Sequence, residues 1–146
     1  MECKIRKTVE GDLPRLAEIM KESFKLSPWN EKWEGLSCLE RLSDIFHMPS
    51  SIAFTAIDEQ DKPLGSVMGF ILPHPDGKEA TLLECFVDPS HIGGGLGTAL
   101  MESVMLALKE EGVKTTMFYT SGTLDSFYSR FGFKRSENCY LMTKEN

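Results

Sequence analysis

The spacing of hydrophobic residues changes along the chain and predicts both helices and strands. Apolar residues recur every three or four positions over residues 13–24 and again over 36–46, which predicts two helices. Asp12 stands where the N-cap of the first helix is expected. A third and longer helical pattern covers residues 96–111, and Gly112 is a residue type that favours the end of a helix.

Segments rich in β-branched and apolar residues, separated by polar turns, fill most of the remaining chain. They predict strands over residues 4–9, 51–57, 64–72, 78–87, 115–120, 133–135 and 138–143, with a short helix over 124–131. This order of elements predicts a mixed α/β fold, in which a mixed sheet carries helices on both faces. The length of 146 residues suits a single domain over 1–146.

The expected strand over 78–87 contains a carboxylate that its apolar pattern does not explain. Alternation predicts two faces for this strand, with Leu82, Glu84 and Phe86 on one and Thr81, Leu83, Cys85 and Val87 on the other. A carboxylate among apolar neighbours is costly unless it is solvated or used. Glu84 is therefore either a catalytic base or a surface group that faces water or pairs with a lysine.

Composition and charge exclude several classes of protein. Lysine and arginine total 16 while aspartate and glutamate total 22, so the net charge is −6 and nucleic-acid binding is not expected. The longest apolar run, 104–108, is far too short for a membrane span. The four cysteines are far apart and have no metal-ligand spacing, so we expect free thiols and no metal site. No apolar leader follows Met1, which predicts a cytoplasmic protein.

A glycine-rich segment, Gly93-Gly94-Gly95-Leu96-Gly97, lies between the strand 78–87 and the long helix. Glycines let the backbone approach a ligand, and the start of the following helix adds free N–H groups and the positive end of the helix dipole. This combination is typical of phosphate binding. A Walker loop would need Gly-Lys-Ser/Thr, but Thr98 follows Gly97 directly, and the G-x-G-x-x-G spacing of dinucleotide-binding folds is not completed either.

Two segments resemble the motifs of the GNAT acetyltransferase superfamily. Val87-Asp88-Pro89, followed after a spacer by Gly95-Leu96-Gly97, is similar to motif A, the loop that binds the pyrophosphate of acetyl-coenzyme A. Phe127-Tyr128-Ser129-Arg130-Phe131-Gly132-Phe133 is similar to motif B. The resemblance implies a central, mostly antiparallel, twisted sheet of about six to seven strands, with acetyl-coenzyme A as cosubstrate. It assigns cofactor binding to Cys85, Phe86, Val87, Ile92, Gly93, Gly94, Gly95, Leu96, Gly97, Thr98 and Ser121.

The resemblance also implies direct transfer of an acetyl group to a primary amine. Glu84 would take a proton from the amine as general base, and Tyr128 would protonate the departing thiolate as general acid. A backbone N–H of Cys85, Phe86 or Val87 would stabilise the charge on the carbonyl oxygen. For Tyr128 the alternative is packing in the core, and the thiol of Cys85 is expected to be a small buried apolar group.

Two positions differ from the family pattern. Ile92 stands where the family has Gln or Arg, so phosphate binding would depend on backbone donors alone. Ser121 stands where an Asn often supports the pantetheine arm.

The acceptor would be an amine on a small molecule or a peptide, and the sequence leaves its identity and a homodimer open. Trp29 and Trp33 lie between the first two helices, where they would either line the acceptor site or form a hydrophobic cluster. Two other functions stay open: a noncatalytic acyl-CoA-binding or sensor domain, which Ile92 favours, and a GNAT enzyme that uses a longer acyl donor.

Overall fold

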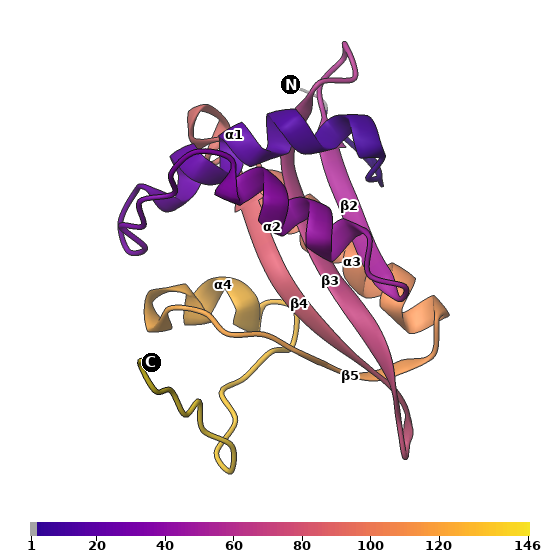
Figure 1. The fold of residues 1–146 in the computed structure, drawn as a ribbon. Coiled ribbons are helices and arrows are strands. Elements are labelled where there is room, and N and C mark those ends of the chain that lie inside the picture. Colours follow the sequence, from indigo (N-terminus) through magenta and orange to yellow (C-terminus); the bar gives the residue numbers. More distant parts are fainter. Residues whose placement is uncertain (1–2) are drawn as a thin grey trace.

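The computed structural model describes residues 3–146, which form one five-stranded sheet in the order β1-β2-β3-β4-β5 (Figure 1). The strands are β1 (Lys4–Lys7), β2 (Ser51–Ile57), β3 (Pro63–His74), β4 (Gly77–Val87) and β5 (Val113–Met117). Neighbouring strands are antiparallel, except that β4 and β5 are parallel. A parallel pair needs a crossover, and α3 (Leu96–Glu110) supplies it. The mixed, mostly antiparallel sheet is confirmed.

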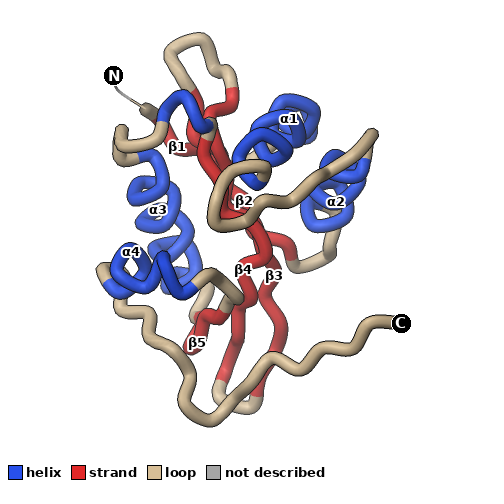
Figure 2. Tube along the Cα trace, turned by 90° about the vertical axis from the view of Figure 1, so that its left-hand side faces the viewer, coloured by secondary structure: helices blue, strands red, loops and turns tan. Residues whose placement is uncertain are grey.

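Helices cover both faces of the sheet, as predicted (Figure 2). On one face lie α1 (Leu13–Phe24) and α2 (Ser37–Phe46), and on the other lie α3 and the short α4 (Asp125–Ser129). Three 3-10 turns connect these elements: η1 (Glu10–Asp12), η2 (Pro89–His91) and η3 (Gly122–Leu124). None of the helices in this part of the chain combines the length and the apolar character that crossing a membrane requires.

The two helical layers bury separate hydrophobic clusters. Under α1 and α2, Leu16 and Leu42 are fully buried in one cluster with Met68 of β3. On the other face, Leu100 of α3 packs in a cluster with Val67 of the same strand. Burying one such side chain contributes about 1.5–3 kcal/mol, so these clusters fix which face of the sheet each side chain occupies.

The sheet has five strands and not the six to seven that were expected. The expected closing strands over 133–135 and 138–143 are loop, and the strand expected over 115–120 ends at Met117. Tyr140, Leu141 and Met142 are all exposed. Strand preference reflects how well a side chain packs on a half-buried surface. These three side chains bury little surface. Their apolar character alone therefore predicted a strand that the fold does not contain.

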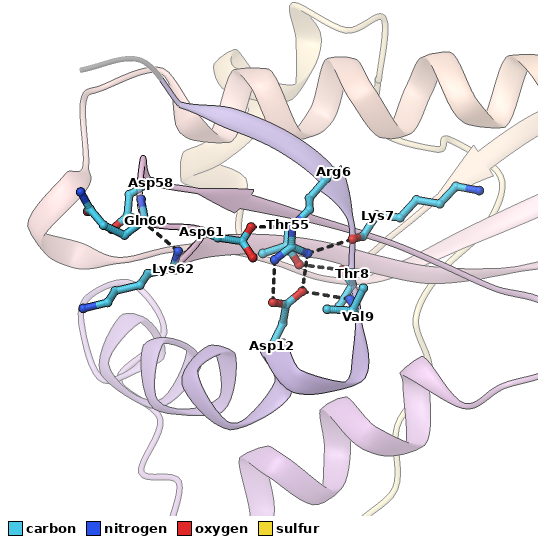
Figure 3. A network of polar contacts seen from close by, with 10 residues as sticks. All are labelled: Arg6, Lys7, Thr8, Val9, Asp12, Thr55, Asp58, Gln60, Asp61 and Lys62. Atoms are coloured by element: carbon cyan, nitrogen blue, oxygen red, sulfur yellow. Dashed lines mark hydrogen bonds and ion pairs between the residues drawn. The ribbon is translucent and has the colours of Figure 1, made fainter.

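A partly buried ion pair connects β1 to the start of α1 (Figure 3). The Asp12 carboxylate accepts hydrogen bonds from Nη1 and Nη2 of Arg6 at 2.8 and 2.9 Å, and from the N–H of Val9 at 2.9 Å. Asp12 directly precedes α1, as predicted, but its side chain does not cap that helix. Burial by itself would raise the pKa of Asp12. Hydrogen bonds from Arg6 and Val9 outweigh burial and hold that pKa below its usual range.

Asp12→Asn is expected to lower the free energy of unfolding by about 2–3 kcal/mol, because the partly buried guanidinium of Arg6 loses a charged acceptor. The matched control is Asp61→Asn. Asp61 also pairs with Arg6, at 3.0 Å, but its side chain is exposed, and its loss should cost less than about 1 kcal/mol. Urea denaturation at neutral pH measures both losses. Equal losses would show that the pair with Asp12 stabilises the fold no more than the exposed pair with Asp61.

The pH dependence gives a second check on the same pair. The folded-state pKa of Asp12 is depressed. The stability that it contributes is therefore present above its unfolded pKa and is lost as the pH falls through its folded pKa. The difference between Asp12→Asn and wild type should accordingly shrink in acid.

Candidate active site

A β-bulge in β4 determines which way its side chains point. Glu84 pairs with Met68 of β3 and Leu82 pairs with Gly69, so Leu83 has no partner residue on β3. Gly69 allows the two strands to approach at this point, since a Cβ there would lie 2.1 Å from a backbone carbonyl oxygen of β4. The bulge therefore depends on the absence of a side chain at this position.

The bulge changes the alternation that the sequence predicted. Leu82 packs in the cluster under α3, whereas Phe86 packs under α1 and Glu84 pairs with a residue of α2. The prediction that Leu82 shares a face with Glu84 and Phe86 is wrong, because the extra residue shifts the pleat by one position. Cys85 lies on the α3 face together with Leu82. Beyond the bulge, β4 therefore presents Glu84 on one face and Cys85 on the other.

β4 and β5 separate close to the bulge. Their last paired residues are Thr81 and Met117, and beyond them β4 continues beside β3 only. Among the described residues, no strand pairs with the β5-facing edge of β4 after Thr81. The backbone of Cys85, Phe86 and Val87 belongs to this part of β4. An open edge of this kind presents N–H and C=O groups that can bind an extended ligand.

Glu84 is buried beside an arginine of α2. The Glu84 side chain is 7% exposed, and its Oε1 accepts a hydrogen bond from Nε of Arg41, whose side chain is 43% exposed. Burial raises the pKa of Glu84 above its usual range, and the Arg41 guanidinium opposes that change only in part. A raised carboxyl pKa lies closer to neutral pH, where a general base is most effective.

Aromatic side chains lie on the same face of the sheet as this carboxylate. The ring of Phe24, at the end of α1, makes edge-to-face contacts with Trp29 and Phe86 at centroid distances of 5.4 and 6.2 Å. Trp33 donates a hydrogen bond from Nε1 to Glu31 at 3.1 Å. Both tryptophans pack against the cluster under α1 and α2 while remaining partly exposed. Their membership of a hydrophobic cluster is confirmed, and their place in an acceptor site stays a prediction.

Tyr128 lies on the other face, at the separation of β4 and β5. Its ring is 4.5 Å from that of Phe118, which follows β5, and it packs in the cluster under α3 together with Cys85. Burial and the neighbouring Cys85 raise the pKa of Tyr128, so the hydroxyl keeps its proton in neutral and moderately alkaline solution. Burial also raises the pKa of Cys85 to about 12, which makes its thiol a poor nucleophile.

The glycine-rich segment leads directly into α3. Gly95 is the N-cap and has a φ of 83°, a left-handed conformation that glycine adopts without strain. The first backbone hydrogen bond of the helix runs from the N–H of Ala99 to the carbonyl of Gly95, at 3.0 Å. The N–H groups of Leu96, Gly97 and Thr98 therefore have no intrahelical acceptor and are available to an anion.

The other predicted residues of this loop differ in what they present. Ile92 is 69% exposed, and Gly93 and Gly94 are also exposed. The side chain of Leu96 is buried in the cluster under α3, which leaves only its backbone for a ligand. Gly97 faces the ring of Phe127, which would lie 3.4 Å from a Cβ at that position. Gly97 therefore lies beside α4.

Ser121 lies at the start of η3, after β5. Its Oγ accepts a hydrogen bond from the N–H of Thr123 at 3.4 Å and contacts the Thr123 hydroxyl at 3.0 Å. These local contacts make Ser121 the cap of a turn. A contact of Ser121 with a pantetheine arm stays a prediction.

Two arginines close to these groups were not predicted from the sequence. Arg41 pairs with Glu84, and Arg130, at the C-cap of α4, donates from Nη2 to Oγ1 of Thr98 at 3.0 Å. Each contact joins elements far apart in the chain, and no local motif marks Arg41. Only the position of Arg130 inside the Phe127–Phe133 segment could have drawn attention to it.

Known proteins match the chain in sequence and in structure. A model of the Acetyltransferase (GNAT) family matches residues 13–133. A predicted acetyltransferase from Clostridium acetobutylicum, solved with acetyl-CoA, has a TM-score of 0.76 at 14% identity and covers 97% of this chain and 96% of its own. Glucosamine-6-phosphate N-acetyltransferase from Arabidopsis thaliana has a TM-score of 0.74 at 19% identity, with 99% of each chain covered.

A third match is an aminoglycoside acetyltransferase from an uncultured soil metagenomic sample, in complex with sisomicin. Its TM-score is 0.72 at 18% identity, with 99% of this chain and 95% of its own covered. At such identities the solved structures establish only the fold. The match to the family model establishes which family the chain belongs to. It runs from the start of α1 to Phe133 and so includes β4, the glycine-rich segment, α3 and α4. The chain belongs to the GNAT acetyltransferase family.

Proposed function

We propose that this protein transfers an acetyl group from acetyl-coenzyme A to a primary amine by direct attack. The observation that carries the proposal is the separation of β4 from β5, with Glu84 on one face of β4 and Tyr128 on the other. A thioester bound along the open edge of β4 would lie between a base and an acid.

The reaction combines one acyl transfer with proton transfers at the amine and at the sulfur. Glu84 takes a proton from the ammonium group, because only the neutral amine can attack. The amine nitrogen bonds to the thioester carbonyl carbon, and a backbone N–H of Cys85, Phe86 or Val87 donates to the negatively charged carbonyl oxygen. The C–S bond then breaks, its electron pair stays on sulfur, and the Tyr128 hydroxyl protonates the thiolate.

Both proton-transfer groups return to their starting state by the end of the cycle. Glu84 releases the proton of the ammonium group to solvent. As the amide forms, the attacking nitrogen loses a second proton, which restores the Tyr128 hydroxyl directly or through water. This return is necessary because a thiol with an ordinary pKa of about 8.5 is a stronger acid than tyrosine. Tyr128 therefore acts as a donor to the sulfur as charge develops there, and it does not end the cycle as tyrosinate.

The acceptor would approach Glu84 from the face covered by α1 and α2. Trp29 and Trp33 are partly exposed there, and Glu31 adds negative charge, a combination that favours a cationic ligand. Two of the structural neighbours are named for amino-sugar acceptors, glucosamine-6-phosphate and an aminoglycoside. A substrate search should begin with amino sugars and then cover polyamines, amino acids and peptide amines.

Turnover measurements test this proposal. The purified protein is given acetyl-coenzyme A and each amine of the panel, and free thiol and acetylated product are measured. Acetylated product formed from acetyl-coenzyme A supports the proposal. Turnover only with longer acyl thioesters would point to a different donor. Binding of coenzyme A without turnover over the whole panel would favour a sensor domain.

Gly95→Ala is expected to weaken coenzyme A binding by about tenfold or more, because a Cβ at its φ of 83° strains the loop by about 1–2 kcal/mol and turns the N–H groups away from the phosphates. The matched control is Gly112→Ala. Gly112 follows α3 with a φ of 80° and open space around it, so the strain is similar but lies at the far end of the helix. Calorimetry that shows equal losses in both variants would contradict a phosphate site at Gly95.

A further inference from the structure

We propose that Arg130 binds the pyrophosphate of the acyl donor and supplies the positive charge that the side chain at position 92 lacks. This inference rests on the proposed use of a coenzyme A thioester. Ile92 is apolar and exposed, so it offers no donor to a phosphate. The cation comes from α4, a different part of the fold.

The position of Arg130 is the first argument. Its Nη2 donates to Oγ1 of Thr98 at 3.0 Å. Thr98 is the third residue of α3, and its N–H is one of the three that precede the first hydrogen bond of the helix. The guanidinium therefore contacts the same turn of α3 whose backbone groups are available to an anion.

The guanidinium of Arg130 is also held in place by aromatic rings. It lies over the ring of Phe127 at 4.9 Å and within 5.7 Å of the ring of Phe131. Phe127 in turn packs against Gly97 at the start of α3. Stacking on aromatic rings leaves the edges of a guanidinium free to donate, and it reduces the conformational freedom that would be lost on binding.

Arg130 also has no carboxylate partner among the described residues. Arg15 and His91, the other basic residues near the glycine-rich segment, lie 3.3 and 3.7 Å from Asp88. Arg135 pairs with Asp125 at 2.7 Å. Within residues 3–146, no acidic side chain forms an ion pair with Arg130. Its charge is therefore not neutralised, and its remaining donors can bind a phosphate, the ligand that a guanidinium fork matches best.

This arrangement bears on the choice between an enzyme and a sensor. Ile92 favoured a noncatalytic domain because it removed a polar side chain from the phosphate site. If Arg130 provides that charge, the site has both the backbone donors of α3 and one cation. The residue at position 92 then no longer argues against tight donor binding.

Calorimetry with coenzyme A and with 3′-dephospho-coenzyme A tests the inference. Arg130→Gln keeps much of the side-chain stem and removes the charge. It is expected to weaken binding of both ligands by about tenfold and to make binding less sensitive to salt. Arg135→Gln, the matched control, removes an arginine that is already paired and should change affinity by less than about twofold. Arg130→Lys should recover part of the loss.

The possible outcomes distinguish between the role of Arg130, the proposed function and the choice of phosphate group. Wild-type affinity in Arg130→Gln would overturn this inference alone, whereas a wild-type protein that binds neither ligand would overturn the proposed function and this inference with it. A loss seen with coenzyme A but not with its 3′-dephospho form would overturn the assignment to the pyrophosphate.

Ile92→Arg tests the inference independently, in case the Arg130→Gln variant does not fold. Added to wild type, it should tighten binding by less than about threefold, and a much larger gain would show that the phosphates lack a cation.

Discussion

Replacing Tyr128 with phenylalanine is expected to lower kcat by about 10²–10⁴-fold while coenzyme A affinity changes little. The substitution removes one hydroxyl and keeps the ring that packs between Phe118 and Phe127. If that hydroxyl protonates the departing sulfur, its loss affects the transition state and not the binding of the donor. Single-turnover measurements with saturating acetyl-coenzyme A, together with calorimetry, separate the two effects.

Tyr140→Phe is the matched control for this experiment. Tyr140 lies in the exposed C-terminal segment, so the same chemical change should leave kcat within about threefold of wild type. A Tyr128→Phe enzyme that is equally active would show that Tyr128 only packs in the core. Because burial raises the pKa of Tyr128, no loss of wild-type activity through its ionisation is expected until the solution is strongly alkaline.

The helices and most strands could be predicted because their hydrophobic pattern describes the surface that they bury. The apolar stripe of residues 13–24 is the stripe that α1 places on the sheet, and the glycine-rich segment lies at the start of α3 as expected. The closing strands could not be predicted on the same basis. The residues from Tyr140 to Met142 are apolar, yet they are exposed, and a pattern does not show whether a partner strand is present.

The surroundings of Glu84 could be predicted only in part. Its apolar neighbours in sequence left open whether Glu84 is buried or faces water, and the side of the sheet that each neighbour occupies depends on the bulge at Leu83. That bulge requires the close approach of β3 at Gly69, a contact between residues far apart in the chain. Arg41, the partner of Glu84, and Arg130, the partner of Thr98, could not be predicted for the same reason. Each lies far in sequence from its partner, and only the fold brings the two together.

Glu84→Gln is expected to lower turnover by about 10²-fold at neutral pH, where the acceptor amine arrives protonated and needs a base. At a pH above the pKa of the amine the deficit should shrink, because the amine is already neutral. Glutamine keeps the size of the side chain, and burial disfavours the ionised carboxylate in the folded state. The variant should therefore be at least as stable as wild type at neutral pH, which thermal denaturation checks. A pH–rate profile identical to that of wild type would assign the proton to another group or to water.

Arg41 gives an independent test of the same base. Its guanidinium partly opposes the effect of burial on Glu84, so Arg41→Met should raise the pKa of Glu84 further. A base works only when it is deprotonated, and the acid limb of kcat/KM should therefore move to higher pH in this variant. Lys25→Met is the control, since it removes the same charge from an exposed pair with Glu22 and should leave the limb in place. If Arg41→Met lowered the rate equally at every pH, Arg41 would be needed for structure or acceptor binding and Glu84 would not be the group that titrates. The expected direction of the shift follows from the charge that is removed, because a carboxylate that loses a neighbouring positive charge holds its proton up to a higher pH.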